Sequence, residues 1–382
     1  MPSSLRFSAG GYDLQALAED GERIFCRGSR NGADGSRKRV LAVLPAARLA
    51  TPVSLDRLAH EYALRDELDD AWAARPLELV REPDRTLLVL EDPGGEPLAW
   101  SLGAAMEVGG FLRLAIAIAG ALGNVHAAGL VHKDIKPTNI LVDSATNAVW
   151  LTGFGIASRL PRERQSPAPP EVIAGTLAYM APEQTGRMNR SVDSRSDLYA
   201  CGVTFYQMLT GTLPFSAADP MEWIHCHIAR QATPPSERVR GIPAALSAIV
   251  MKLLAKTAEE RYQTSAGVVA DLRRCQAEWE ARGSIEPFTL GARDVSDRLI
   301  IPEALYGREF EIDRLLAAFE RIVAGGPTEL VLVSGYSGIG KSSVVNEVHK
   351  ALVPPRGLFA SGKFDQYKRD IPYATLDRKS VV

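Results

Sequence analysis

The chain has 382 residues, of which 46% are hydrophobic and 24% are charged, and its formal net charge at pH 7 is -2. This length exceeds one core of ordinary size, so we expect two domains. The composition excludes an intrinsically disordered chain, and the small net charge gives no reason to expect nucleic acid or an anionic membrane as a partner.

Four cysteines, Cys26, Cys201, Cys226 and Cys275, lie far apart and show neither CxxC nor zinc-finger spacing. This spacing predicts reduced thiols in a cytoplasmic protein. The N-terminal segment lacks the apolar stretch of a signal peptide, and no apolar run of about 18 residues occurs. We therefore expect neither secretion nor a membrane span.

The beginning of the chain alternates short strand-like runs with turn clusters. We expect five strands, at residues 12–16, 22–27, 39–44, 77–81 and 86–91. A glycine-rich turn at residues 31–36 precedes the third strand, and residues 1–11 are assigned to an N-terminal tail. One helix is predicted over residues 55–68, because apolar residues recur there at helical spacing. Together these elements form a small β-rich lobe.

The pattern then becomes helical. Residues 109–128 are nearly all apolar, which predicts a helix that is buried on most sides. Further helices are expected at residues 197–210, 220–230, 245–257 and 265–279. A stretch marked by glycine and proline, residues 283–303, is predicted to be a linker. A helix at residues 309–323 and a strand at residues 329–334 then open a separate α/β unit.

The loop VHKDIKPTN, residues 131–139, resembles the catalytic loop of protein kinases, in which HRD is followed after four residues by Asn. Phosphoryl transfer needs a carboxylate that orients the attacking hydroxyl and an amide oxygen on a nearby metal ion. The resemblance gives these two roles to Asp134 and Asn139, and it makes Lys136 a cation that faces phosphate. Further landmarks of the family follow in the expected order, namely Phe154-Gly155, Ala181-Pro182-Glu183, Asp197 and Arg261.

Three of these landmarks are structural in protein kinases. Glu183 and Arg261 correspond to an ion pair that ties the activation segment to the helical lobe, and Asp197 corresponds to a carboxylate that holds the catalytic-loop backbone. They argue for the fold and not for chemistry. We therefore expect an α+β two-lobed protein-kinase-like fold over residues 12–282.

Three departures from the family concern the nucleotide. Where protein kinases have Asp-Phe-Gly, this chain has glycine at Gly153, which cannot bind magnesium through a side chain. The strand that should carry the phosphate-binding lysine reads RVLAVL, and its alignment with the family places Ala42 at the lysine position. Lys38 is four residues away, a displacement of about 13 Å along a strand. Of the glycine-rich loop, only Gly21 is present.

Two functions remain open at this stage. Losing one preorganised electrostatic group typically costs roughly 10² to 10³ in rate, and two are missing, which favours a regulatory pseudokinase. The alternative is an active serine/threonine protein kinase with unorthodox metal binding and Asp134 as base. Glu61 is the natural partner of the missing lysine, and we expect it to make another polar contact.

Two other features invite a functional interpretation. The activation segment, residues 153–183, could recognise a partner, but a solvated loop is the simpler expectation. The cluster His225-Cys226-His227 suggests a metal site. Because consecutive residues on a helix point about 100° apart, the three side chains cannot converge on one ion, and we do not expect zinc.

A second nucleotide site is predicted near the C-terminus. The sequence GYSGIGKS, residues 335–342, satisfies the P-loop pattern GxxxxGKS, with an apolar run before it and a helix-compatible segment after it. Glycines let backbone N–H groups approach phosphate, the lysine reaches the β- and γ-phosphates, and the serine binds magnesium. The predicted cofactors are ATP and Mg²⁺. The predicted binding residues are Gly335, Gly338, Gly340, Lys341 and Ser342.

Upstream of the P-loop, the sequence LYGRE, residues 305–309, resembles the box that opens AAA-like and signalling ATPase domains. No apolar strand that ends in aspartate occurs between Lys341 and the C-terminus. The hydrolytic half of such a domain is therefore absent from this sequence. We expect residues 304–376 to be the start of a partial α/β P-loop NTPase domain.

The order of kinase-like domain, linker, GRE box and P-loop resembles large bacterial proteins described as trifunctional serine/threonine kinase, ATP-binding protein and sensor histidine kinase. The stretches EQTGRMNRSVDSRSDLYA, VSGYSGIGKSSVVNEVHK and GKFDQYKRDIPYATL strengthen this resemblance. It implies downstream ATPase and histidine-kinase regions in a longer parent, and it makes this chain an N-terminal fragment of a signalling protein. A protein partner on the kinase-like surface is also expected.

The last six residues, 377–382, do not continue that pattern. They are also encoded by GATCGGAAGAGCGTCGTG, part of a common sequencing adapter. We therefore expect a non-native tail there.

Overall fold

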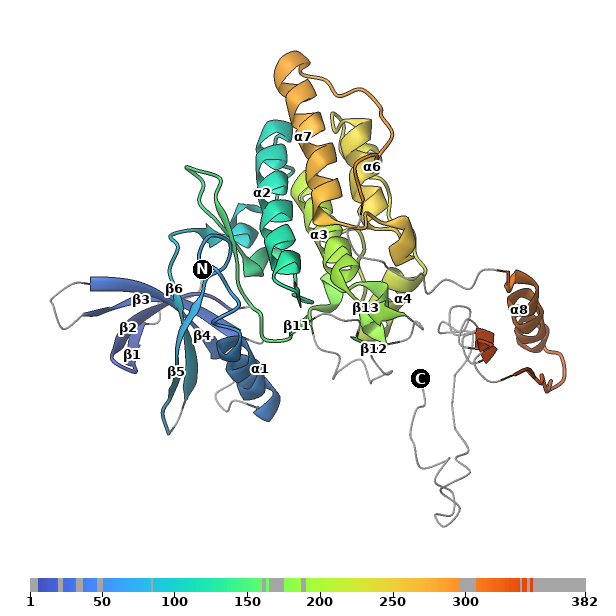
Figure 1. Ribbon diagram of the computed structural model, residues 1–382, viewed down its shortest axis with the longest axis horizontal. Coiled ribbons are helices and arrows are strands. Elements are labelled where there is room, and N and C mark those ends of the chain that lie inside the picture. The colour runs from blue at the N-terminus through green and yellow to red at the C-terminus, as the bar shows by residue number, and fades with distance from the viewer. Residues whose placement is uncertain are drawn as a thin grey trace, which may run out of the picture.

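The structure is a computed structural model of the chain. It describes residues 6–19, 23–31, 37–46, 51–83, 85–159, 163–164, 175–186, 190–295, 307–336, 339–341 and 344–345. A twisted β-sheet lies beside a bundle of helices, and the N-terminal part of the chain forms the sheet (Figure 1). The predicted two-lobed α+β architecture is therefore confirmed.

The small lobe is built on a six-stranded antiparallel sheet with strand order β1-β2-β3-β4-β6-β5. The strands are β1 (Arg6–Ala9), β2 (Tyr12–Glu19), β3 (Arg23–Asn31), β4 (Arg37–Pro45), β5 (Pro76–Arg81) and β6 (Thr86–Glu91). The five predicted strands are present. Strand β1 precedes them, within the segment that the sequence assigns to a tail.

Helix α1 (Pro52–Ala63) covers one face of this sheet. Thr51 caps the helix by accepting a hydrogen bond from the Ser54 N–H, and Pro52 occupies the first turn, where a missing N–H costs nothing. Leu58 of α1 packs in an apolar cluster with Leu41 and Val43 of β4. The helix is thereby held against β4, the strand that would carry the phosphate-binding lysine in protein kinases.

The helical lobe is arranged around α2 (Val108–Ala127), which packs against α3 (Ser194–Thr210) and α7 (Ser265–Arg282). Among the described residues, α2 is the one helix that is long and apolar enough to cross a membrane, by length and composition. Phe111, Leu112 and Ile118 of α2 are buried in the core of the lobe, which explains its apolar character. The other helices of this lobe are α3 (Ser194–Thr210), α4 (Pro220–Ile228), α5 (Pro235–Arg238), α6 (Ala244–Leu253) and α7 (Ser265–Arg282).

Short strands and 3₁₀ helices form the segments that connect the longer helices. Strands β7, β9 and β10 form a three-stranded sheet, β8 pairs with β11, and β12 pairs with β13. Their bounds are β7 (Glu96–Pro97), β8 (Leu130–Val131), β9 (Ile140–Val142), β10 (Val149–Leu151), β11 (Ser158–Arg159), β12 (Glu163–Arg164) and β13 (Ser191–Val192). The 3₁₀ helices are η1 (Leu98–Ser101), η2 (Pro137–Asn139), η4 (Leu177–Tyr179), η5 (Pro182–Thr185) and η6 (Ala258–Glu260).

The segment after α7 belongs to the helical lobe. Gly283 ends α7 with a left-handed φ of 66°, which glycine adopts without strain. Phe288 and Leu290 then pack against the core, and the Asp294 carboxylate accepts hydrogen bonds from the N–H groups of Gln263 and Thr264 at 2.6 and 2.9 Å. The first part of the predicted linker is therefore docked on the domain.

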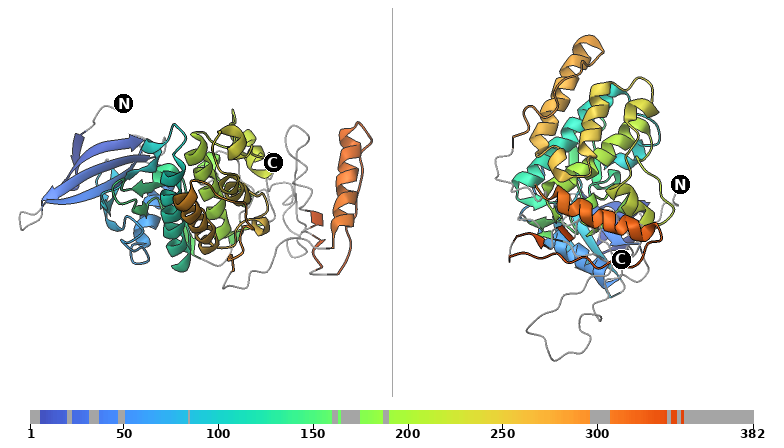
Figure 2. Two further views of the ribbon diagram at one scale, coloured as in Figure 1. Left: turned by 90° about the horizontal axis from the view of Figure 1, so that it is seen from above. Right: turned by 90° about the vertical axis from the view of Figure 1, so that its right-hand side faces the viewer.

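In the C-terminal region, α8 (Glu309–Val323) coincides with the predicted helix. The strand predicted at residues 329–334 is not formed. These residues lie in neither a helix nor a strand. Leu330 and Leu332 are 86% and 83% exposed. A strand needs a neighbour with which to exchange hydrogen bonds, and the described residues of this region provide none. Figure 2 shows α8 from two further directions.

Candidate functional site

The sequence-predicted catalytic loop faces a small cleft between the two lobes. The small lobe contributes Ala18, Arg23, Phe25 and Val43, the connecting segment contributes Pro97 and Trp100, and the helical lobe contributes Thr138, Asn139, Thr152 and Gly153. The cavity measures about 30 Å³, which is room for about two water molecules. Pockets that hold small molecules typically measure roughly 300 to 1,000 Å³.

Asp134 is held by groups of its own lobe. Its Oδ1 atom accepts hydrogen bonds from the N–H and the hydroxyl of Thr176, at 3.1 and 3.0 Å. The Lys136 ammonium lies 3.3 Å from its Oδ2 atom and donates to the Thr176 hydroxyl at 2.7 Å. Burial acts to raise the pKa of Asp134, but the charges of Lys136 and Arg23 outweigh it, so the pKa lies below its usual value.

Asp197 holds the backbone of the catalytic loop through hydrogen bonds. Its carboxylate accepts hydrogen bonds from the N–H groups of His132 and Lys133, at 2.8 and 2.7 Å. These bonds hold Lys133 in a left-handed conformation with φ of 68°. The His132 ring accepts the Asp134 N–H at Nδ1, and its Nε2 lies 2.9 Å from the Thr152 carbonyl oxygen. Burial lowers the pKa of His132, so the ring is neutral.

The predicted ion pair between Glu183 and Arg261 is present and bidentate. The two guanidinium nitrogens donate to the two carboxylate oxygens at 2.7 and 2.9 Å. Both side chains are buried, and the Ser196 hydroxyl donates to Glu183 at 2.7 Å. A buried pair of this kind needs its hydrogen bonds satisfied, which these contacts achieve.

The predicted metal ligand Asn139 is engaged by other groups. Its Nδ2 atom donates to the backbone oxygen and the Oδ2 atom of Asp134, at 2.7 and 3.0 Å. Its Oδ1 atom accepts a hydrogen bond from the Arg23 guanidinium at 2.9 Å. Gly153 lies against the same amide, because a Cβ atom at this position would come within 2.7 Å of Asn139.

The cleft therefore does not fit magnesium-bound ATP. Magnesium is held by oxygen ligands, mainly carboxylates and phosphates. Gly153 supplies no carboxylate, a cation contacts the Asn139 oxygen, and the cavity is an order of magnitude smaller than a small-molecule pocket.

The structure places the position of the kinase lysine one residue away from where the sequence alignment puts it. Val43 lines the cleft and packs with Leu58 of α1, whereas Ala42 is fully buried in the cluster on the opposite face, beside Val40 and Cys26. Successive strand residues point to opposite faces of a sheet, so a register difference of one residue exchanges them. The assignment of Ala42 as the residue that faces phosphate is wrong for this structure, and Val43 faces the cleft.

Glu61 makes the alternative polar contact that was expected of it. Its Oε1 atom accepts the Gly153 N–H at 3.0 Å. Burial raises the pKa of Glu61, and the charge of Arg23 and the N–H groups of Phe154 and Gly153 partly oppose this effect. Arg23 thus acts on Glu61, Asp134 and Asn139. It was missed from the sequence because a lone arginine has no recognisable pattern.

The P-loop is described in part, and Gly338 and Ser342 lie outside the described residues. The Lys341 ammonium donates to the carbonyl oxygens of Gly335 and Tyr336, at 2.9 and 2.7 Å. Gly340 has a φ of 92°, a conformation that favours glycine. The lysine of the motif therefore lies against the backbone of the loop in which phosphate would be bound.

The histidine-cysteine cluster serves packing. Cys226 and His227 are buried, the His227 Nδ1 atom lies 2.9 Å from the Tyr199 hydroxyl, and its ring stacks on Trp223. No group of three side chains that could hold a metal ion occurs in the described part of the chain.

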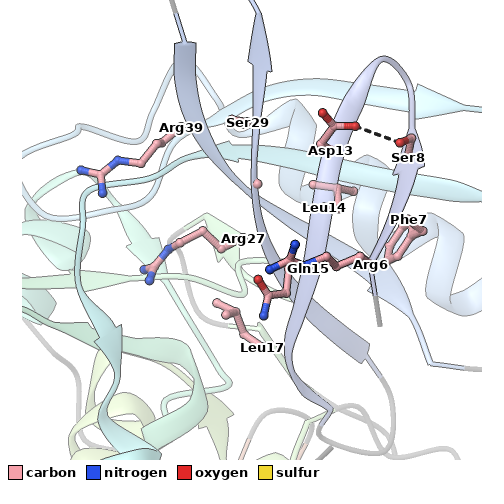
Figure 3. A pocket seen from close by; sticks show the side chains of 11 residues that line it. Arg6, Phe7, Ser8, Asp13, Leu14, Gln15, Leu17, Arg27, Ser29 and Arg39 are labelled. Atoms are coloured by element: carbon pink, nitrogen blue, oxygen red, sulfur yellow. Dashed lines mark hydrogen bonds between the residues drawn. The ribbon is translucent and has the colours of Figure 1, made fainter. Parts of the chain in front are cut away.

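A second hollow of about 880 Å³ lies on the sheet of the small lobe, across strands β1 to β4 (Figure 3). Arg27 and Arg39 extend from neighbouring strands, and Arg6 comes from β1 (Figure 3). Arg27 pairs with Asp92 at 2.9 Å, whereas Arg6 and Arg39 are exposed. The hollow contains none of the catalytic-loop residues and has a basic rim.

Comparisons with known proteins agree with this architecture. The protein kinase domain family matches residues 47–271, and the AAA ATPase domain family matches residues 304–381. The hybrid signal transduction histidine kinase G of Dictyostelium discoideum is 36% identical over 221 residues, which cover 53% of this chain and 6% of that protein. The serine/threonine-protein kinase PknB of Mycobacterium tuberculosis is 43% identical over 154 residues, covering 40% of this chain and 24% of that protein.

A third relative, the serine/threonine-protein kinase Pkn1 of Myxococcus xanthus, is 39% identical over 187 residues, covering 48% of this chain and 27% of that protein. The chain thus spans between 6% and 27% of the length of these three relatives. The kinase match begins after β4, so it leaves out the strand that contains Ala42 and Val43.

Proposed function

The chain belongs to the protein kinase family, and we propose that its kinase domain is a regulatory module that does not transfer phosphate. The observation that carries this proposal is the contact between Arg23 and Asn139 at 2.9 Å, beside a glycine at position 153. The Arg23 guanidinium donates a hydrogen bond to the Asn139 amide oxygen, which would bind a metal ion in an active kinase. The neighbouring position has no carboxylate, and the cleft has no lysine among its described residues.

These losses act on the electrostatic part of catalysis. Phosphoryl transfer depends on positioning and on neutralising charge at the phosphates. Each missing preorganised group costs roughly 10² to 10³ in rate, and the two costs need not add. A kinase domain that retains its fold but lacks these groups can still present a surface to a partner.

The signalling context supports a regulatory role. An AAA ATPase region follows the kinase domain, and we propose that ATP and Mg²⁺ bind there, at Lys341 and Ser342 of the P-loop. One relative is a hybrid histidine kinase of which this chain covers 6%. We propose that the chain is the N-terminal part of a longer cytoplasmic protein with the trifunctional architecture, in which the kinase domain regulates the downstream ATPase and histidine-kinase regions.

The surface offers a place for a protein partner. The hollow over β1 to β4 carries Arg6 and Arg39 on its rim, and both residues are exposed. Acidic side chains of a partner would be attracted to this rim. This surface is separate from the cleft, so a partner could bind there without nucleotide.

An active serine/threonine kinase is the second candidate. It is favoured by the arrangement around Asp134, whose carboxylate is hydrogen-bonded to Thr176 and lies 3.3 Å from the Lys136 ammonium. A carboxylate held in this way remains ionised and can accept the proton of a substrate hydroxyl.

Phosphoryl transfer by the whole chain decides between the two candidates. We expect negligible incorporation of radiolabel from ATP into generic protein acceptors or into the chain itself. The assay should use Lys341→Ala, so that labelled ATP bound at the P-loop is not counted as incorporated label. Turnover near roughly 1 to 100 per second that is abolished by Asp134→Asn would contradict the regulatory proposal.

A further inference from the structure

Arg23 joins the two lobes across the cleft. It begins β3 in the small lobe, and its Nη2 atom donates to Asn139 Oδ1 of the helical lobe at 2.9 Å. The same nitrogen lies 3.8 Å from Asp134 Oδ2. Its charge also lowers the pKa of Glu61, whose burial acts in the opposite direction. One side chain of the small lobe therefore contacts two groups of the helical lobe.

The surrounding groups need such a cation. Glu61 is buried, and the Asp134 side chain is only 11% exposed, so both carboxylates are largely removed from water. A buried carboxylate is costly unless a positive charge or hydrogen bonds compensate it. Lys136 compensates Asp134 within the helical lobe. Among the described residues that line the cleft, Arg23 is the one with a positive charge.

The guanidinium group suits this position. It is always charged and presents several donors in one plane, so it can satisfy an amide oxygen and a carboxylate at once. Two other residues that line the cleft, Val43 and Gly153, carry neither a charge nor a long side chain. A space of about 30 Å³ remains in the cleft beside the arginine.

We infer that Arg23 is a clasp that holds the two lobes closed, because it supplies from within the protein a positive charge that contacts Asn139 and Asp134 of the helical lobe. This inference rests on the proposed regulatory function and specifies how its cleft is regulated. The closed arrangement then needs neither nucleotide nor metal ion. A partner of the kinase domain would meet one rigid arrangement of the two lobes.

The test uses the whole chain with three substitutions. Arg23→Gln removes the charge, and Arg23→Lys keeps it. Arg30→Gln is the matched control, because Arg30 lies on the same strand but pairs with Glu78 of the small lobe at 3.5 Å and does not reach the helical lobe. The four native cysteines are buried, so spin labels can be attached at Val53→Cys in the small lobe and Arg240→Cys in the helical lobe.

We expect Arg23→Gln to lower the unfolding temperature by about 5 °C, with a longer or broader distance between the labels. Magnesium chloride alone should recover part of this loss, because Asp134 and Asn139 then present two oxygen atoms to a cation. Arg23→Lys should lose less than Arg23→Gln. The wild type and Arg30→Gln should differ by about 1 °C or less, and neither should respond to magnesium.

The clasp would be overturned by an Arg23→Gln protein whose unfolding temperature and label distance match those of Arg30→Gln. A loss of stability with an unchanged label distance would also overturn it, since Arg23 would then stabilise the small lobe alone. These outcomes are independent of phosphoryl transfer. A wild-type chain that transfers phosphate would refute the regulatory function, whatever the label distances are.

Discussion

The kinase domain and the C-terminal region retain different features of a nucleotide-binding protein. The kinase domain retains residues that hold the fold, and the C-terminal region retains residues of a phosphate-binding motif. In the kinase domain Glu183 and Arg261 of the framework are buried and paired in the core, while the cleft has neither the lysine nor the carboxylate that would handle phosphate. In the C-terminal region the P-loop keeps Lys341, while Leu330 and Leu332 beside it remain exposed. Residues that hold a fold and residues that handle phosphate can therefore be retained or lost separately.

The largest expected effect tests which strand residue faces the cleft. Ala42→Lys would place an ammonium group in an apolar cluster, at a cost of about 4 to 7 kcal/mol if the buried lysine shifts its pKa by 3 to 5 units. Val43→Lys would direct it into the cleft, near Glu61, and should cost much less. Chemical denaturation of both variants measures the difference.

Equal stability of the two lysine variants, or a less stable Val43→Lys, would support the alignment that places Ala42 on the cleft side. Ala42→Val and Val43→Ala serve as uncharged controls for changes in packing volume. This result bears on the comparison between the two regions, because it identifies the residue that stands where protein kinases have the phosphate-binding lysine.

The next effect concerns the framework. Glu183→Gln leaves the Arg261 guanidinium buried without its counter-charge, so the free energy of unfolding should fall by about 3 to 5 kcal/mol. Nucleotide binding at the P-loop should not change. Urea denaturation followed by titration with a fluorescent ATP analogue measures both quantities. Glu278→Gln, which breaks an exposed helical pair with Arg274, is the control and should cost less than about 1 kcal/mol.

A third change, in the C-terminal region, is expected to affect ATP binding. Lys341→Ala removes a charged donor to phosphate, which corresponds to about 1.5 to 3 kcal/mol and weakens ATP binding roughly 10- to 100-fold. Asp134→Ala should leave ATP binding nearly unchanged. Titration in the presence and absence of magnesium, in the longer protein proposed above, measures the affinity. Loss of binding with Asp134→Ala and its retention with Lys341→Ala would place the nucleotide in the kinase cleft.

Much of the kinase domain follows from local sequence. The apolar spacing of residues 109–128 predicts α2, and the motifs around Asp134, Glu183, Asp197 and Arg261 predict contacts that the structure contains. The helix can be predicted because helical periodicity is encoded in neighbouring residues. The long-range contacts follow from the resemblance of these motifs to those of protein kinases, and not from local sequence alone.

The tertiary structure alone decided the state of the cleft. The faces of Ala42 and Val43 depend on strand register, and the reach of Arg23 to Asn139 depends on how closely the lobes approach. The predicted strand at residues 329–334 lacks a neighbour among the described residues, and the docking of Asp294 on α7 joins positions about 30 residues apart in sequence. Each of these features depends on contacts between segments that are distant in the chain. Local patterns carry no information about such contacts, because a hydrogen bond or an ion pair forms only when folding brings both of its partners together.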